Sequence, residues 1–314
     1  MAVRYFGRGV KALQVLKMSN KIAIGTVQFG TSYGISNKVG QTHVEEVTRI
    51  LDYAQKQGIT TLDTAAVYGD SEAILGQVLQ SGNSKFKIIT KTPHFNVEVI
   101  TDAELAFLHS CFLQSLERLG LEKIEGLLIH ACDDLFANNG QKLFKELEML
   151  KVQGIVKMIG VSVYSSQQID RVLNEFSIDL VQLPVNVFDQ RFIEDGSLDR
   201  LKNQNVEVHT RSTFLQGLLL MPVESISSWF TPVLPAIKRF HAFAHEMGLS
   251  PLQLALGFVN ALEQVDRIVI GVNNLAQLQE IVQAANTFID VVQCKELSVQ
   301  DPRFINPGNW PVGV

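Results

Sequence analysis

The sequence is poor in cysteine, has only a small excess of charge and lacks long apolar runs. Its three cysteines, Cys111, Cys132 and Cys294, are odd in number and show no C-x-x-C spacing, which argues against a disulfide framework or a structural zinc site. Lys and Arg number 27 against 32 Asp and Glu, so no broad positive field favours nucleic acid or an anionic membrane. No apolar run approaches the roughly 20 residues that span a bilayer. We therefore expect a cytoplasmic protein with a small-molecule partner, without bound metal, nucleic acid or membrane.

The chain does have enough apolar residues for a large core. It is 314 residues long, with 46% hydrophobic and 19% charged residues, a composition that excludes an intrinsically disordered chain. This length allows either two domains or one large α/β barrel. Nothing in the composition marks a domain boundary, and no feature of the sequence specifies an oligomeric state.

Short β-branched or apolar runs recur along the chain and predict eight strands. They are residues 22–25, 60–63, 87–91, 124–129, 156–161, 179–183, 206–210 and 267–270. Between most of them lies a helical pattern, such as the three- and four-residue spacing of apolar side chains from Val44 to Ala54, which stops at Gly58. Helix follows strand throughout, so the sequence predicts a parallel α/β fold.

A single-domain (β/α)8 TIM barrel fits this count best. The alternative is a doubly wound sheet, but the first connection, from Gly25 to Gly30, lacks the G-x-G-x-x-G of a Rossmann unit. We assign residues 21–285 to the barrel and residues 286–314 to a C-terminal tail that packs near the active-site rim. Residues 1–20 form an N-terminal extension, with a hairpin capping the barrel floor as one interpretation.

Helix caps and one long connection refine this assignment. Three pairs have the spacing of a capping box: Thr42 with Glu45, Thr101 with Glu104, and Asn274 with Gln277. The stretch from 211 to 266 is too long for one loop and one helix. It predicts an irregular loop over 213–234 on the C-terminal rim, followed by helices over 235–247 and 251–262, the second capped by Ser250.

Polar residues occur at the ends of the predicted strands. Asp63, Lys91 and His130 each end or directly follow a strand, and Tyr68 lies five residues after Asp63. Later strand ends carry Ser162, Gln182, Arg211 and Gly271. One charged residue at a strand end normally just faces solvent. Three ionisable groups converging on the C-terminal face of a barrel, where such folds keep their chemistry, instead indicate a catalytic site.

Together, these side chains could donate a proton to a carbonyl group that receives a hydride. A tyrosine has an ordinary pKa of about 10 and is a weak acid unless a positive charge favours its phenolate. Lys91 is expected to supply that charge, and Asp63 to hold the ammonium in place. His130 is expected to donate or relay a proton beside Tyr68 and to orient the carbonyl oxygen.

The sequence resembles the aldo-keto reductases. The resemblance rests on the motifs around the four residues, Leu62-Asp63-Thr64-Ala65-Ala66-Val67-Tyr68-Gly69, Ile89-Thr90-Lys91 and Leu128-Ile129-His130, and on the run Gly271–Leu278. It extends from about residue 21 to residue 285. It implies a carbonyl reductase with an ordinary barrel, no metal, and NADP(H) as cofactor, with NAD(H) as the alternative.

The resemblance also implies a role for each site residue. Asp63, Tyr68, Lys91 and His130 would form the catalytic tetrad, with Tyr68 as the proton donor. Thr26 and Asp63 would lie near the nicotinamide ribose, and Ser162 and Gln182 would bind the carboxamide. The pyrophosphate would be lined by Ser212, Phe214, Gln216 and Gly217, and the adenosine end by Gly271, Asn273, Gln277 and Glu280. At this last end, free amides of a helix N-terminus would favour a phosphate.

Several positions depart from the family pattern. Val163 replaces a common asparagine, and Ile281 stands where an asparagine often contacts adenine. Gln277 and Val272 replace basic residues that often bind the 2′-phosphate. Arg211 occupies the place of an aromatic ring that stacks on the nicotinamide. Its charge would disfavour the oxidised cofactor, or it would hold an anionic or polyhydroxylated substrate.

Three functions are weighed. The first is NADPH-dependent reduction of an aldehyde or ketone, including sugar-derived ones. The second is a cofactor-binding regulatory module like the potassium-channel beta subunits, which carry an asparagine at the place of His130. The third is a lyase or isomerase that forms a Schiff base on Lys91. The complete acid set favours the first. We interpret His94 and His209 as solvated surface histidines.

Overall fold

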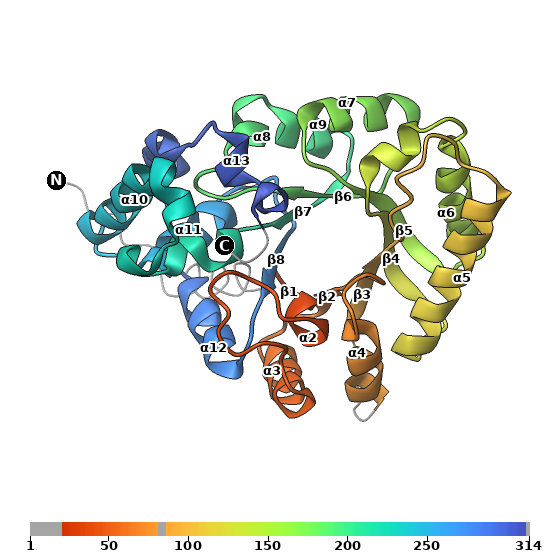
Figure 1. The fold of residues 1–314 in the computed structure, drawn as a ribbon, viewed down its shortest axis with the longest axis horizontal. Helices are drawn as coiled ribbons and strands as arrows, with labels where there is room; N and C mark the ends of the chain where they lie inside the picture. The colour runs from red at the N-terminus through yellow and green to blue at the C-terminus, as the bar shows by residue number, and fades with distance from the viewer. Residues whose placement is uncertain (1–20, 81–85, 312–314) are drawn as a thin grey trace, which may run out of the picture.

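The computed structural model describes residues 21–80 and 86–311 and forms a closed (β/α)8 barrel, as the sequence predicts. Eight parallel strands pair in chain order, and β1 closes on β8 (Figure 1). Each predicted strand lies within one residue of its observed bounds. The strands are β1 (Ile22–Gly25), β2 (Thr61–Asp63), β3 (Lys87–Lys91), β4 (Ile124–Ile129), β5 (Val156–Ser162), β6 (Leu180–Pro184), β7 (Glu207–Arg211) and β8 (Arg267–Gly271).

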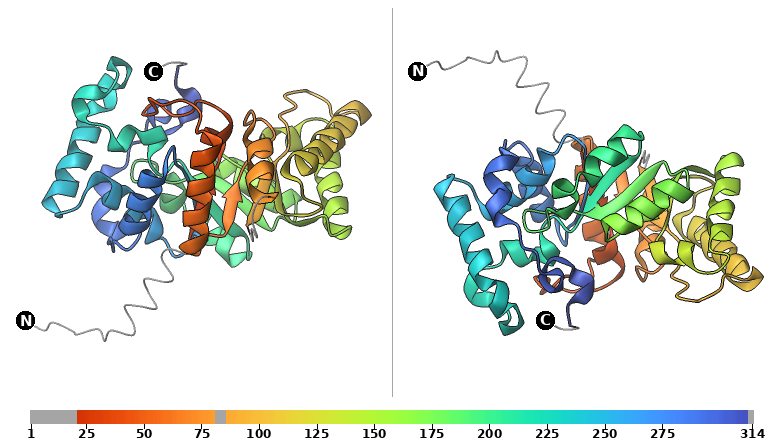
Figure 2. Two further views of the ribbon diagram at one scale, coloured as in Figure 1. Left: turned by 90° about the horizontal axis from the view of Figure 1, so that it is seen from below. Right: turned by 90° about the horizontal axis from the view of Figure 1, so that it is seen from above.

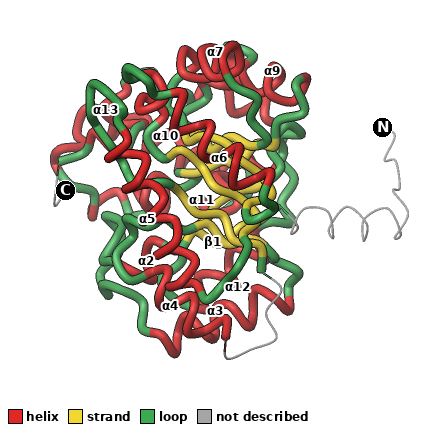
Figure 3. Tube along the Cα trace, turned by 90° about the vertical axis from the view of Figure 1, so that its right-hand side faces the viewer, coloured by secondary structure: helices red, strands yellow, loops and turns green. Residues whose placement is uncertain are grey.

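Helices surround the strands on the outside (Figure 3). They are α2 (Val27–Gly30), α3 (Val44–Lys56), α4 (Ser71–Gln80), α5 (Asp102–Leu119), α6 (Gln141–Val152), α7 (Ser166–Glu175), α8 (Arg191–Glu194), α9 (Ser197–Asn203), α10 (Leu234–Glu246), α11 (Pro251–Asn260), α12 (Leu275–Ala284) and α13 (Pro302–Ile305). The long connection between β7 and β8 carries α10 and α11, which pack together on one side of the barrel (Figure 2). Within the described ranges, none of the helices has the length and hydropathy needed to cross a membrane.

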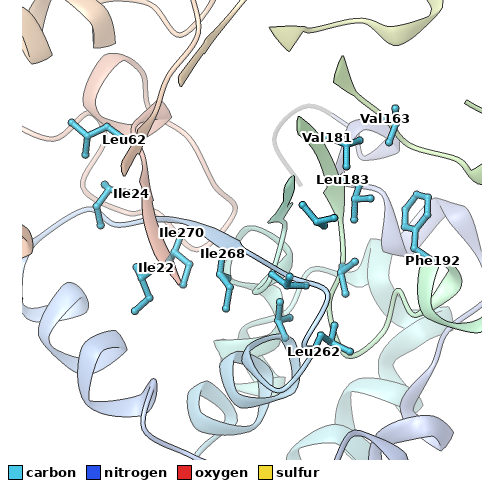
Figure 4. Close-up of a cluster of buried hydrophobic side chains, with 14 of the residues drawn as sticks. Ile22, Ile24, Leu62, Val163, Val181, Leu183, Phe192, Leu262, Ile268 and Ile270 are labelled. Atoms are coloured by element: carbon cyan, nitrogen blue, oxygen red, sulfur yellow. The ribbon is translucent and has the colours of Figure 1, made fainter. Parts of the chain in front are cut away.

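The larger core lies between the strands and these helices. Ile22 and Ile24 of β1 are in register with Ile268 and Ile270 of β8, and all four are almost fully buried (Figure 4). Alternate residues of a strand share a face, so the residues between them point the other way, into the barrel. A second, smaller cluster contains Ile89, Leu128 and Leu180. Lys91 lies two residues after Ile89 in β3 and therefore shares its face.

Two of the predicted caps are confirmed and two need correction. Thr101 forms the capping box with Glu104, and Ser250 caps α11. Thr42 does not cap α3, whose N-cap is His43 without a side-chain bond. The Thr42 hydroxyl instead donates to the carbonyl of Asn273 at 3.3 Å.

At α12 the capping box is only half formed. Asn274 accepts from the backbone amide of Gln277, as expected for a cap. The Gln277 side chain, however, accepts from the amide of Asn273 at 2.8 Å and not from that of Asn274. In both corrected cases, a contact with the loop after β8 replaces the local bond that spacing predicts.

The rim of the barrel is built from irregular segments. Residues 212–233, here called the β7–α10 loop, contain three short 3₁₀ segments. In the tail, the indole of Trp310 packs edge-on against Phe230 of this loop, with ring centroids 4.9 Å apart. The N-terminal extension expected over residues 1–20, and the hairpin considered for it, lie outside the described residues.

Candidate active site

One cavity of about 730 Å³ opens among the C-terminal ends of the strands. This volume lies within the range of roughly 300–1,000 Å³ that small-molecule and cofactor sites occupy. Its wall includes Asp63, Tyr68 and His130. Lys91 is not part of the wall but lies directly behind it, with a side chain that is 1% exposed.

A buried ion pair forms the base of the cavity. The Lys91 ammonium donates to Asp63 Oδ1 at 2.7 Å and to the carbonyl of Thr64 at 2.8 Å. The Gln182 amide donates to Asp63 Oδ2 at 2.8 Å. Both carboxylate oxygens and two ammonium protons therefore have partners, which is the condition under which a buried charge pair is tolerated.

Tyr68 lies above this pair, with the Lys91 nitrogen 5.1 Å from its ring centroid. The side chain is brought there by the turn after β2, in which the Tyr68 amide bonds to the carbonyl of Ala65. Burial raises the pKa of the Tyr68 phenol above its ordinary value, and the Lys91 charge opposes this rise without reversing it. The phenol is therefore protonated at neutral pH, contrary to the idea that Lys91 makes it more acidic than a free tyrosine.

His130 stands beside Tyr68, with ring centroids 6.1 Å apart. Burial, followed by the charges of Lys91 and other neighbours, lowers the pKa of His130 to about 2. The imidazole is therefore neutral, and a relay through a charged histidine does not fit this site. A neutral ring still has one N–H to donate to an oxygen.

The structure brings the other predicted site residues onto the same cavity wall. They are Thr26, Ser162, Gln182, Arg211, Ser212, Phe214, Gln216, Gly217, Gly271, Asn273, Gln277 and Glu280. Thr26 is fully buried, and its hydroxyl donates to the carbonyl of Asp63 at 3.0 Å. It therefore also helps to fix the end of β2.

Four polar atoms on this wall are buried and have no hydrogen-bond partner among the described residues. They are Gln28 Oε1, His130 Nδ1, Thr213 Oγ1 and Asn273 Oδ1. Buried polar groups normally have partners, so unpaired ones along a cavity indicate a polar ligand. The set runs from the tetrad residues to the start of α12, and an elongated ligand such as a nicotinamide dinucleotide fits this distribution.

The comparison with known families agrees with this geometry. The sequence model of the Aldo/keto reductase family matches residues 21–298. The chain belongs to this family. Members are NAD(P)H-dependent oxidoreductases that act on carbonyl and alcohol groups, and this chain is one of them.

Relatives cover most of the chain at low identity. The 6-dehydroglucose reductase of Agrobacterium fabrum (strain C58 / ATCC 33970) is 25% identical over 296 residues, 88% of this chain and 94% of that protein. The L-glyceraldehyde 3-phosphate reductase of Escherichia coli (strain K12) is 26% identical over 305 residues, 86% of this chain and 87% of that protein. The holo form of the aldo-keto reductase AKR11C1 from Bacillus halodurans superimposes with a TM-score of 0.69 at 18% identity, covering 93% and 94% of the two chains. This structural likeness shows the shared fold.

In this aldo-keto reductase the β7–α10 loop begins with unusual backbone. Ser212, Leu215 and Gln216 have positive φ angles of 63°, 48° and 54°, a region that non-glycine residues rarely adopt. Gly217 follows with φ 94°. Such strained positions are concentrated at ligand sites, and all but Leu215 line the cavity.

The start of α12 differs from the expected phosphate site. The amide of Leu275 donates to Glu46 Oε1 of α3 at 2.7 Å, and the amides of Asn273 and Gln277 are also bonded to side chains. The prediction that free amides await a phosphate at this terminus is therefore wrong for these three groups. A carboxylate already interacts with the positive end of the helix dipole.

Some cavity residues gave no signal in the sequence. Tyr33, Ser36 and Lys38 line the cavity from the loop over residues 31–43, here called the α2–α3 loop. Tyr164 lines it from the residues after β5. These residues lie in irregular segments where spacing predicts no direction for the side chain, and only the closed fold brings them to the site.

One histidine was misjudged from the sequence. His209 was interpreted as solvated, but it is 1% exposed and hydrogen-bonds to Glu207 at 2.9 Å. It occupies an alternate position of β7, two residues before Arg211, and parallel barrel strands are buried on both faces. His94 is exposed, as expected, with its ring centroid 4.3 Å from that of His130.

Proposed function

We propose that this aldo-keto reductase uses NADPH to reduce an aldehyde or ketone to an alcohol, with Tyr68 as the proton donor. The observation that carries the proposal is the buried Lys91–Asp63 pair, 2.7 Å long, placed beneath the Tyr68 ring. The bound cofactor would supply the hydride. The residues of the chain would bind the carbonyl oxygen, give it a proton and stabilise the charge that remains.

Each tetrad residue has a defined task in this proposal. Tyr68 is protonated at neutral pH because burial raises the pKa of its phenol, so it can give a proton to the developing alkoxide. Lys91 then stabilises the phenolate that remains, and Asp63 keeps the ammonium charged. Neutral His130 would donate an N–H to the carbonyl oxygen and hold it next to the phenol.

The two other functions fit the site less well. A Schiff base needs a neutral, accessible amine, but Lys91 is buried and its pKa is raised, since Asp63 and then Tyr68 outweigh the effect of burial. A pure binding module has no need for an acid set aligned with a cavity. Lys91, Asp63 and Tyr68 instead form the connected arrangement that proton donation requires.

We propose a sugar-derived carbonyl compound as the substrate class. The relatives named 6-dehydroglucose reductase and L-glyceraldehyde 3-phosphate reductase support this class. Tyr33 and Tyr164, each 40% exposed, provide rings and hydroxyls on the wall that suit a polyhydroxylated chain. We also propose a cytoplasmic location, which the three free cysteines support.

Two observations bear on the choice between NADPH and NADH. Exposed Lys38 lines the cavity and offers a cation to a 2′-phosphate, which supports NADPH. Glu46, bonded to the start of α12, would repel the same phosphate and favours NADH as the second candidate. Titration of the protein fluorescence with each cofactor measures both dissociation constants and decides between them.

Replacing Tyr68 by phenylalanine tests the proposed acid. We expect Tyr68→Phe to lower kcat for reduction by about 10²–10⁴-fold while NADPH still quenches the protein fluorescence, because the ring remains and only the hydroxyl is lost. The assay is a panel of sugar-derived aldehydes and ketones with NADPH consumption recorded. Tyr53→Phe, on α3 and away from the cavity, is the matched control. Undiminished turnover in Tyr68→Phe would show that the acid lies elsewhere.

A further inference from the structure

Arg211 is a half-buried cation on the cavity wall with no carboxylate partner among the described residues. Its guanidinium carbon lies 4.1 Å from the ring centroid of Tyr164. Its one hydrogen bond in the described structure is a long one, 3.4 Å from Nη2 to the carbonyl of Val163. Neither contact removes the charge, so the guanidinium keeps its full field inside the cavity.

The other charges at this end of the cavity cancel one another. Lys91 and Asp63 form an ion pair. Tyr68 is protonated and His130 is neutral, because burial acts against the charged form of each. Arg211 therefore gives the reacting end of the site a net positive charge.

The charge of Arg211 affects His130 and Tyr68, the two groups proposed to bind and protonate the carbonyl oxygen. After burial, Lys91 and His94, its charge contributes to lowering the pKa of His130, and it also opposes the raised pKa of Tyr68. A ring that delivers hydride must come within roughly 3.5 Å of the carbonyl carbon, and the carbonyl oxygen must reach Tyr68. Any such ring therefore lies within the field of Arg211.

The reaction changes the charge of that ring. In the proposed reaction, a bound reduced nicotinamide would supply a hydride, with both of its electrons, to the carbonyl carbon. Tyr68 would give the proton to the oxygen, and the oxidised nicotinamide would carry one positive charge. The reduced ring is neutral, so a fixed cation nearby discriminates between the two forms.

We propose that Arg211 selects the redox state of the cofactor: its uncompensated charge weakens binding of the oxidised nicotinamide relative to the reduced one. This inference rests on the proposed function. It makes the site a better reductase than alcohol dehydrogenase, because the reduced cofactor is held and the oxidised product is released.

Equilibrium binding tests the inference without a substrate. The ratio of the dissociation constants of NADP⁺ and NADPH isolates the nicotinamide ring, since the two forms share the same phosphates and adenosine. We expect Arg211→Gln to lower this ratio by about tenfold, because it removes a unit charge several ångströms from the ring. Arg211→Lys keeps the charge and should keep the ratio within about threefold of the wild type. Arg211→Tyr is a second uncharged variant if the glutamine variant does not fold.

The outcomes separate this inference from the proposed function. A ratio that is the same in wild type, Arg211→Gln and Arg211→Tyr would overturn the role of Arg211. An unchanged ratio with a higher KM for anionic carbonyl substrates would also overturn it and assign the guanidinium to the substrate. If the wild type bound neither cofactor form, the proposed function would fail together with the inference.

Discussion

The Lys91 ammonium acts on three neighbours with different results. It forms a charged hydrogen bond with Asp63 and offsets part of the burial effect on Tyr68. It also adds to the burial effect on His130, lowering that pKa further. Burial, reinforced at His130 by this cation, thus leaves the Tyr68 phenol protonated and the His130 imidazole neutral in the neutral range.

These shifts predict a flat pH profile for reduction. The proposed proton donor, Tyr68, must carry its proton, and its raised pKa keeps the phenol protonated through neutral pH. His130, with a pKa of about 2, does not titrate there. We expect kcat/KM for reduction to be level from about pH 5.5 to about pH 10, because the phenol ionises only above the ordinary tyrosine pKa of about 10.

Stopped assays in buffers of constant ionic strength measure this profile. His94 is the imidazole next to His130, and His94→Asn is the control for a contribution from it. A step near neutral pH that persists in His94→Asn and is absent in His130→Asn would contradict the neutral assignment of His130.

The site residues that sequence identified share one property. Asp63, Lys91 and His130 end or follow strands whose register the apolar pattern fixes, so their convergence follows from the barrel alone. Their protonation states do not follow, because burial and distances decide them. Tyr33 and Tyr164 were missed because loops bring them to the cavity.

Glu72 connects two helices and a strand next to the site. It lies in α4 with 1% exposure and accepts from Arg118 of α5 at 2.8 Å and from Thr90 of β3 at 2.8 Å. Thr90 precedes Lys91, and strand alternation points the first outward and the second inward. The Glu72 network therefore anchors the outer face of β3, while Lys91 on the inner face pairs with Asp63.

Removing Arg118 should destabilise the fold. Arg118→Met leaves the Glu72 carboxylate buried with Thr90 as its one remaining side-chain partner among the described residues. We expect a loss of about 2 kcal/mol, reduced by the partial exposure of Arg118. Urea unfolding monitored by circular dichroism measures the change. Arg239→Met, which breaks the exposed Arg239–Glu296 pair, is the control and should change stability little. Equal stability of the two variants would refute a structural role for the buried pair.

At the level of elements, strands were predictable and some helix caps were not. The bounds of β1, β3 and β4 match because apolar runs and flanking turns determine them locally. The cap of α3 was mispredicted because Thr42 bonds to Asn273, 231 residues away in the chain. A cap that competes with a tertiary contact cannot be read from spacing alone.

Two segments far apart in the chain meet across the cavity. The Ser36 hydroxyl of the α2–α3 loop donates to the carbonyl of Gln216 in the β7–α10 loop at 3.2 Å, and Ser36, Gln216 and Gly217 all line the cavity. The contact needs a glycine at 217, because an added Cβ would lie 1.9 Å from Ser36 Oγ. The shape of this part of the cavity therefore depends on a contact between the α2–α3 loop and the β7–α10 loop.

Gly217→Ala should open this contact and weaken cofactor binding. The added methyl displaces Ser36, and the positive φ of 94° adds backbone strain of about 1 kcal/mol. Gly154→Ala is the matched control, because Gly154 also has a positive φ of 71° but an added Cβ meets nothing within 4 Å. We expect both variants to lose similar stability and only Gly217→Ala to raise the Kd for NADPH in fluorescence titration. Both variants carry the same kind of backbone strain, so a rise in Kd confined to Gly217→Ala would come from the lost contact between the two loops. Equal Kd values for the two variants would show that this contact does not contribute to cofactor binding.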